Sequence, residues 1–185
     1  NVKALLNDFY EKWFGPAAKP MRDYYETLEN AFDNAAAHGH EDVVLPLVYT
    51  PAAMTRLAAD MKKAEAAAST DAEKSHVKLE RLMFDHLNMY AKSLTAKQEL
   101  RFTEAASLMR QMEQLKLKMR EICPMFGWPP SPYSMDWEAA RMDRYVAKTG
   151  GKEGTLLAAL PDSPRFSTDK HDVGRFARWM ETGYN

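Results

Sequence analysis

Cysteine is nearly absent from this chain: Cys123 is the only one among its 185 residues. A single thiol cannot form an internal disulfide, so no disulfide framework holds the fold, and the redox environment stays undecided. We interpret Cys123 as a buried structural thiol, because free cysteine behaves as a small apolar side chain in protein cores.

Long apolar runs and an excess of one charge are also lacking. No apolar stretch approaches the ~18 residues that a membrane-spanning helix needs, and 25 basic residues balance 26 acidic ones to a formal net charge of −1. Glycine-rich phosphate loops, serine–histidine–aspartate arrangements and clusters of basic and aromatic residues are missing as well. We therefore expect no nucleic-acid partner, no membrane partner and no cofactor.

Alternation of apolar and polar residues, the mark of a half-buried strand, is almost absent, and helical periodicity dominates. The sequence predicts an all-α fold: an antiparallel bundle of about five long helices, a shorter C-terminal helix and an irregular tail. We expect the bundle to cover residues 1–160 and the tail, a linker toward a following module, to cover 161–185. The expected helices are 2–13, a second ending near 37, 51–68, 70–93, a fifth ending at 122, and 136–148.

Local signals mark several of these boundaries. Thr50 followed by Pro51 is a helix start, and Thr70 with Glu73 forms a capping box. The fifth helix is expected to be capped by Thr103 or Thr95. The segment 39–50 is predicted to be a loop with at most a short strand, because its proline at position 46 disrupts strand pairing.

An aromatic helix, a Gly-Pro break and a second amphipathic helix open the chain. Gly15 supplies the left-handed position that ends the first helix, and Pro16 suits the first turn of the second. We predict a helix–helix corner whose rings fill a core of its own. The apolar residues at helical spacing in the first helix are Val2, Leu5, Leu6, Phe9, Tyr10 and Trp13.

Two groups of histidines are candidates for a metal or functional site. The segment His38-Gly39-His40-Glu41-Asp42 holds two imidazoles and two carboxylates, but zinc sites usually draw their ligands from separated elements. We favour a polar loop there, and we expect no metal site. His86 lies on the apolar stripe of the fourth helix, between Leu82 and Tyr90. A core histidine with both ring nitrogens hydrogen-bonded is the favoured interpretation over a functional one.

Carboxylates and methionines are abundant, yet neither points to a site. Glycoside cleavage needs two carboxyl groups ~5–10 Å apart across the scissile bond, whereas the acidic residues here fall on the polar faces of predicted helices. The 12 methionines stand at core spacings, so they are better explained as filling of the bundle interior than as a binding groove.

Residues 126–133, Phe-Gly-Trp-Pro-Pro-Ser-Pro-Tyr, form a proline-stiffened aromatic loop. Trp128, Tyr133 and, just inside the last helix, Trp137 are the candidate contact residues of the chain. Three interpretations are open: the rings close the end of the bundle, which we favour, or they stack on a sugar ring, or they contact a neighbouring domain.

The opening segment is the most specific part of the sequence. It contains the run Phe9-Tyr10-Glu11-Lys12-Trp13-Phe14-Gly15-Pro16-Ala17-Ala18-Lys19-Pro20-Met21. This run resembles a segment in a domain-of-unknown-function family of large bacterial proteins related to the α-glucuronidase type of glycoside hydrolase. There it follows the catalytic (β/α)8 barrel and begins a C-terminal helical domain. The tail is similar too, because Phe166-Ser167-Thr168-Asp169-Lys170 and Asp172-Val173-Gly174 precede a tryptophan, as in tails that lead into a β-sandwich module.

The resemblance implies a non-catalytic helical accessory domain of a multidomain, carbohydrate-active protein. Its partners would be the barrel upstream and a β-sandwich downstream, and it would buttress the barrel and line a substrate cleft or a dimer interface. A carbohydrate ligand and an extracytoplasmic or secreted location follow from the same resemblance. The acid and base of glycoside cleavage would belong to the barrel, so no catalytic residue is assigned to this chain.

Two other classes of function stay open. One is a free-standing helical interaction module that binds a partner through methionine-rich grooves. The other is a small metal-dependent helical enzyme that uses His38, His40 or His86. Because the chain begins at Asn1 without an initiator methionine, we expect it to be a piece of a longer protein.

Overall fold

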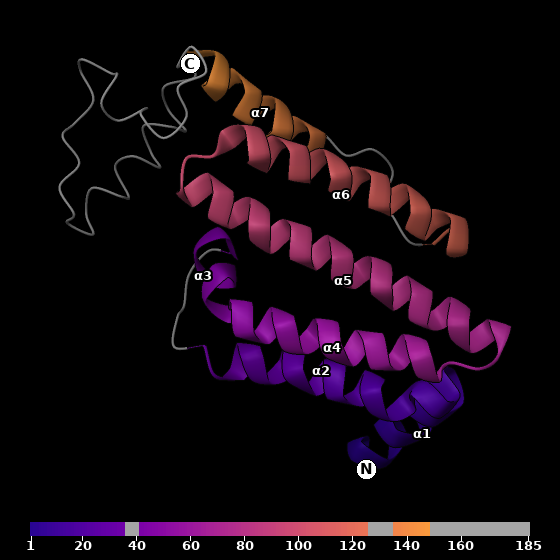
Figure 1. The fold of residues 1–185 in the computed structure, drawn as a ribbon. Helices are drawn as coiled ribbons and strands as arrows, with labels where there is room; N and C mark the ends of the chain where they lie inside the picture. Colours follow the sequence, from indigo (N-terminus) through magenta and orange to yellow (C-terminus); the bar gives the residue numbers. More distant parts are fainter. Residues whose placement is uncertain (36–40, 126–134, 149–185) are drawn as a thin grey trace.

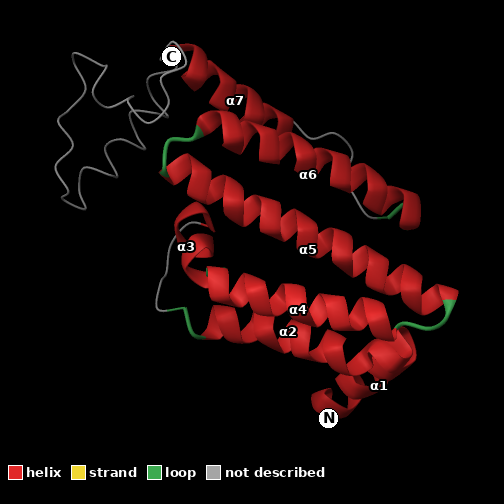
Figure 2. Cartoon of the chain, viewed as in Figure 1, coloured by secondary structure: helices red, strands yellow, loops and turns green. Residues whose placement is uncertain are grey.

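The computed structural model describes residues 1–35, 41–125 and 135–148. It confirms the all-α prediction, because every regular element within these ranges is a helix (Figure 1, Figure 2). In chain order the elements are α1 (Val2–Phe14), the 3-10 helix η1 (Gly15–Ala17), α2 (Ala18–Asp33), α3 (Glu41–Val48), α4 (Pro51–Ala67), α5 (Asp71–Gln98), α6 (Phe102–Ile122) and α7 (Met135–Lys148).

Helix α5, with 28 residues the longest described helix, runs through the middle of the molecule. The pair α2 and α4 lies on one side of it, with α1 near one end of that pair (Figure 1). Helices α6 and α7 lie on the other side, and α3 packs against α5 beside the start of α4. The chain therefore forms layers of helices on either side of one central helix.

Buried apolar side chains form two separate clusters. We call the part built by α1, η1, α2, α4 and the first half of α5 the N-terminal lobe, and the part built by the end of α5, α6 and α7 the C-terminal lobe. The first cluster includes Tyr10, Phe14, Met21, Tyr24, Leu57, Met61, Val77 and Phe84, and the second includes Ala96, Phe102, Ala105, Met109, Met112, Ala139, Met142 and Tyr145. Helix α5 contributes to both clusters.

Methionines fill much of these interiors, as their spacing predicted. Among the side chains that are less than 2% exposed are Met21, Met61, Met109, Met112 and Met142. Their flexible thioethers adapt to the irregular spaces between helices that cross at different angles.

Two predicted helix starts are confirmed by their hydrogen bonds. The hydroxyl of Thr50 accepts from the backbone N–H of Ala53 at 3.3 Å, and Pro51 opens α4. At α5 the hydroxyl of Thr70 accepts from the N–H of Glu73 at 3.2 Å, and the Glu73 carboxylate accepts from the N–H of Thr70 at 3.0 Å. This reciprocal pair satisfies donors that the first turn leaves free.

The expected link between the fourth and fifth helices was wrong. Helix α5 continues past Ser93 to Gln98, because Leu94 and Ala96 in that extension are buried. Neither Thr95 nor Thr103 caps α6: Thr95 lies inside α5, and α6 begins after Arg101, which makes no side-chain cap. Burying the apolar side chains of this extra turn stabilises the longer helix more than a threonine cap would stabilise an earlier break.

The segment after residue 40 was also predicted wrongly, since Glu41–Val48 is helical (α3). Val48 is buried, and α3 packs against α5. Pro46 lies inside this helix, where its missing N–H removes one hydrogen bond of a helix of only eight residues. Packing on α5 thus overrides the local signal for a loop.

Cys123, predicted to be buried, is half-buried at the end of α6, where the next residue is a proline that cannot continue the helix.

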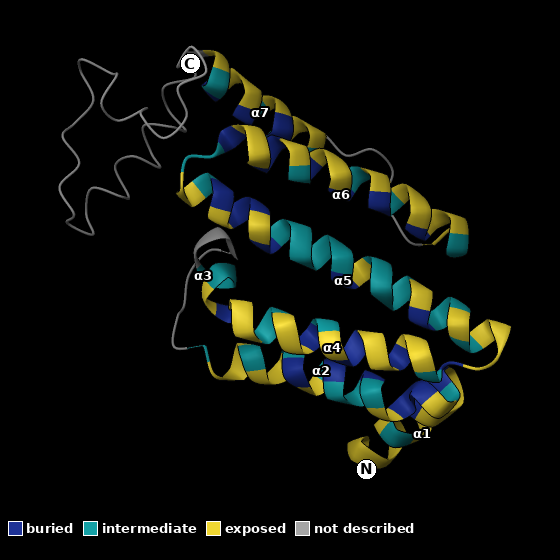
Figure 3. Cartoon of the chain, viewed as in Figure 1, coloured by how far each residue is buried: buried dark blue, intermediate teal, exposed yellow. Residues whose placement is uncertain are grey.

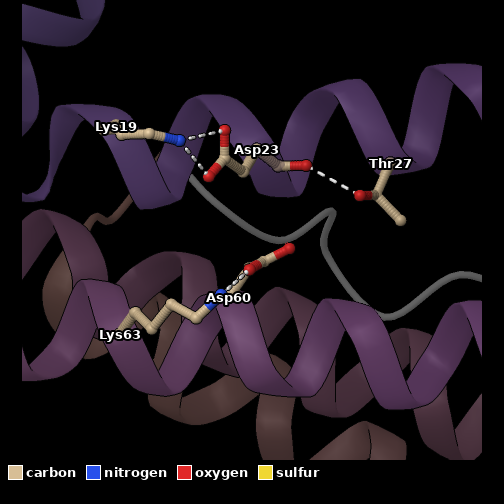
Figure 4. A network of polar contacts seen from close by, with 5 residues as sticks. All are labelled: Lys19, Asp23, Thr27, Asp60 and Lys63. Carbon is tan, nitrogen blue, oxygen red and sulfur yellow. Dashed lines mark hydrogen bonds and ion pairs between the residues drawn. The ribbon is translucent and has the colours of Figure 1, made fainter.

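The α2–α4 pair contains two buried polar side chains, Asp60 and Thr27, each with a partner on its own helix (Figure 4). Asp60 on α4 is 3% exposed and forms an ion pair with the ammonium group of Lys63 at 2.7 Å. On α2 the buried hydroxyl of Thr27 donates to the carbonyl oxygen of Asp23 at 2.8 Å, and the Asp23 carboxylate pairs with Lys19 at 2.7 Å. Each of these groups finds a partner on its own helix, so the two helices close without leaving them unpaired.

Candidate functional site

Of the three predicted aromatic contact residues, only Trp137 lies within the described residues; Trp128 and Tyr133 lie outside them. Trp137 stands on α7 with 47% of its surface exposed. The guanidinium of Arg141 lies 5.2 Å from its ring centroid, and Arg141 is held by an ion pair with Glu138 at 2.7 Å. This cation covers one face of the indole, which leaves less of the ring for a sugar to stack on.

Of the histidine candidates, only His86 lies within the described residues. His38 and His40 lie outside the described residues. Over the described ranges, no group of three or more histidine, cysteine, aspartate or glutamate residues is arranged to hold a metal ion. The expectation for His86 needs a correction: its Nε2 is buried and has no hydrogen-bond partner, so its two ring nitrogens are not both satisfied.

The apolar face of α1 fills the core only in part: Tyr10 and Phe14 belong to the N-terminal cluster, as predicted for the corner, but the rest of the face does not. On this helix only Tyr10 and Phe14 are buried. Five of its large apolar side chains stay between 44 and 73% exposed: Val2, Leu5, Leu6, Phe9 and Trp13. Figure 3 shows much of α1 in the colour of exposed residues. At about 100° of rotation per residue, these five fall within an arc of roughly 100° that adjoins Tyr10 and Phe14. We call this arc the α1 stripe.

One end of the α1 stripe is fixed to α5 by stacked rings. The rings of Trp13 and His76 lie 3.7 Å apart and nearly parallel, at an angle of 7°. The Phe9 ring is stacked 6.1 Å from Trp13. The Nδ1–H of His76 donates to the carbonyl oxygen of Trp13 at 2.7 Å. This hydrogen bond assigns the proton of neutral His76 to Nδ1, because a carbonyl oxygen only accepts.

A close approach between the α1–α2 corner and the start of α5 adds to this attachment. Gly15 has a φ of 52°, and a Cβ at this position would lie 2.1 Å from Oε1 of Glu73. The Glu73 carboxylate also accepts from the backbone N–H groups of Thr70 and Ser69, at 3.0 and 2.9 Å. These backbone hydrogen bonds, that from Thr70 foremost, lower the pKa of Glu73 to about 2. The α1 stripe is thus held at a fixed orientation.

Ionisable side chains lie beside Tyr10, between α1, α2 and α5. The guanidinium of Arg22 is 5.6 Å from the Tyr10 ring centroid, and the rings of Tyr10 and Tyr25 are 5.9 Å apart. Burial raises the pKa of Glu80, and a hydrogen bond with Tyr25 lowers it in part. A carboxyl group with a raised pKa is a feature of general acids, but here it is engaged by a tyrosine. We interpret the Tyr25–Glu80 contact as a tie between α2 and α5.

Two features of this site could not be predicted from the sequence. The capping box identified Glu73, but its approach to Gly15 joins positions far apart in the sequence. His76 carried no signal, because its single polar side chain lies on a helix rich in polar residues. The Gly-Pro break was the available sign that something packs tightly at the corner.

No protein-family model, curated protein or solved structure matches this chain. In the part of the chain that the structure describes, no helix combines the length and apolar character needed to cross a membrane. The family resemblance of the opening run therefore stays an expectation.

Proposed function

We propose that this chain is a non-catalytic helical accessory domain of a multidomain, carbohydrate-active protein, and that it buttresses a preceding catalytic barrel through the α1 stripe. The supporting observation is the exposure of five large apolar side chains on one face of a helix that is otherwise fixed in place. Contiguous apolar patches on protein surfaces mark sites of interaction.

The size of the stripe favours a partner in the same polypeptide. A stable complex between separate proteins buries about 800 Å² on each side, more than five partly exposed side chains on a 13-residue helix offer. Domains joined in one chain are at an effective concentration in the millimolar range. A smaller interface therefore holds them together, and we propose this arrangement over a homodimer built on α1 alone.

The fixed attachment of α1 suits such a buttress. Trp13 belongs to the α1 stripe and also stacks on His76 of α5. A domain that binds the stripe is therefore also held in position relative to the central helix. The free-standing module with methionine-rich grooves has less support, because methionines such as Met61 and Met112 are buried in the two cores. Contacts of Trp128 or Tyr133 with a sugar, a substrate cleft or a β-sandwich remain part of the proposal.

Hydrogen exchange tests the docking proposal. In the complete protein that the gene encodes, the amides of α1 should exchange more slowly than in this chain alone. Leu5→Lys should remove that difference, because it places a charge in the stripe at a position that is 69% exposed and so leaves the chain itself folded. Ala4→Lys is the matched control: it adds the same charge to an exposed position outside the stripe.

Equal exchange of α1 in the complete protein and in the chain alone would contradict the proposal, as would equal effects of the two lysine variants. A second assay addresses catalysis. The purified chain should not hydrolyse aryl glycosides, and turnover above that of a mock preparation would show that the chain is itself an enzyme.

A further inference from the structure

The middle of α5 is a joint between the two lobes. Residues 85–90 of this helix are all half-buried, whereas both its earlier and its later turns contain buried side chains. Phe84 belongs to the N-terminal cluster and Ala96 to the C-terminal one. Over these turns α5 passes from one core to the other, and none of their side chains is buried as fully as Phe84 before them or Ala91 after them.

A histidine with an unpartnered buried nitrogen stands at this joint. Nε2 of His86 is buried without a hydrogen-bond partner, and the charges that act on the ring come from Lys116 and Glu113 of α6. Oε1 of Glu113 accepts from Lys116 at 2.8 Å and also from the backbone N–H of Met135 at 2.8 Å. Met135 is the first residue of α7. The carboxylate whose charge acts on His86 therefore also holds the start of α7.

We propose that His86 is a proton-responsive joint: when its imidazole gains a proton, the C-terminal lobe loosens while the N-terminal lobe stays packed. Protonation puts an N–H on both ring nitrogens, so a charged N–H would stand at the buried Nε2, where there is no hydrogen-bond acceptor. The charge of Lys116 further disfavours this protonated form. The charge on the ring attracts the Glu113 carboxylate, which already accepts from Lys116 and from the N–H of Met135. The contact that fixes the start of α7 is weakened as a result.

The remaining charged groups near this part of α5 belong to a separate network. Arg81, about a turn and a half before His86, pairs with Asp85 at 3.4 Å and with Glu65 of α4 at 3.6 Å. Arg81 is thus paired with Asp85, the sequence neighbour of His86, and with Glu65 of α4. The charges that shift the pKa of His86 are therefore those of Lys116 and Glu113 on α6.

The direction of the effect follows from the pKa of His86. Burial lowers this pKa, with Lys116 adding to the shift and Glu113 opposing it. The unfolded chain therefore binds a proton at about pH 6.5, before the folded chain does. The stability of the C-terminal lobe is complete above this pH, falls as the pH drops through it, and levels off below the folded-state pKa.

Hydrogen exchange of the full chain, corrected for intrinsic exchange rates, measures this loss lobe by lobe. Between about pH 7.5 and pH 5.5 we expect protection of α6 and α7 to fall by more than about threefold, because the unfolded chain gains a proton over this range and the folded chain resists doing so. Protection of α2 and α4 should change by less than about twofold. An equal loss in both lobes would overturn the proposal.

Two variants and a titration assign the effect to His86. His86→Gln should abolish the pH dependence of α6 and α7, whereas His76→Gln, which removes the imidazole of the N-terminal lobe, should leave it intact. In the unsubstituted chain, the amide resonance of Met135 should titrate with the same midpoint as the His86 ring. A pH response that persists in His86→Gln, or a Met135 amide that does not follow the ring, overturns the proposal even where one variant fails to fold.

Discussion

At the scale of single residues, Gly15 shows how a missing side chain joins two helices that are distant in sequence. Its φ of 52° turns the chain from α1 into η1, and its bare Cα admits the carboxylate of Glu73. The same carboxylate closes the capping box of α5. One glycine thus links the end of α1 to the start of α5.

Replacing this glycine should therefore cost more than an ordinary surface change. We expect Gly15→Ala to lower the free energy of unfolding by about 1–3 kcal/mol, since a left-handed alanine is strained and its Cβ displaces Glu73. Urea unfolding measures the loss. In the double variant with Glu73→Ala the clash is gone, so the two changes together should cost less than their sum. Strict additivity would show that the close approach does not matter.

At the scale of elements, hydrophobic periodicity predicted where helices form more reliably than which face they bury. The starts of α4 and α5 followed from Thr50 and Thr70, since a cap is local chemistry. Helix α3 was missed, because its stability comes from packing on α5 and its Pro46 argues locally for a loop. The α1 stripe shows a second limit of sequence-based prediction. The spacing of apolar residues identifies an apolar face of a helix, but it does not tell whether other helices of this chain bury that face.

Two phenylalanines of α1 separate its attached face from its exposed face. Phe14 is 0% exposed and Phe9 is 44% exposed. Phe14→Ala should lower the free energy of unfolding by about 3–5 kcal/mol, because it leaves a cavity in the N-terminal core, while Phe9→Ala should cost less than about 1 kcal/mol. Chemical denaturation of the two variants, side by side, checks this. Similar losses would mean that the α1 stripe is packed after all.

At the scale of the whole molecule, the two cores are filled by separate sets of side chains. Met61 lies in the N-terminal cluster and Met112 in the C-terminal one, and both are 0% exposed. The all-α class and the filling of the interior by methionine could be predicted from composition and spacing. The division into two cores could not be predicted, because it depends on which helices pack on each side of α5.

Truncating either methionine should therefore act mainly on its own lobe. Met61→Ala and Met112→Ala should each cost about 2–5 kcal/mol in local stability. Native-state hydrogen exchange should show reduced protection of α2 and α4 in the first variant and of α6 and α7 in the second. Equal loss across all these helices in both variants would indicate one cooperative unit.

The sharing of α5 has a consequence for dividing the chain into pieces. A fragment that ends after α4 loses Val77 and Phe84 from its core, and one that begins at α6 loses Ala96. The smallest fragments that keep each core and the whole of α5 are residues 1–98 and 71–148, which overlap by the 28 residues of α5. The lobes can be studied apart, but the chain offers no single point at which to cut them cleanly.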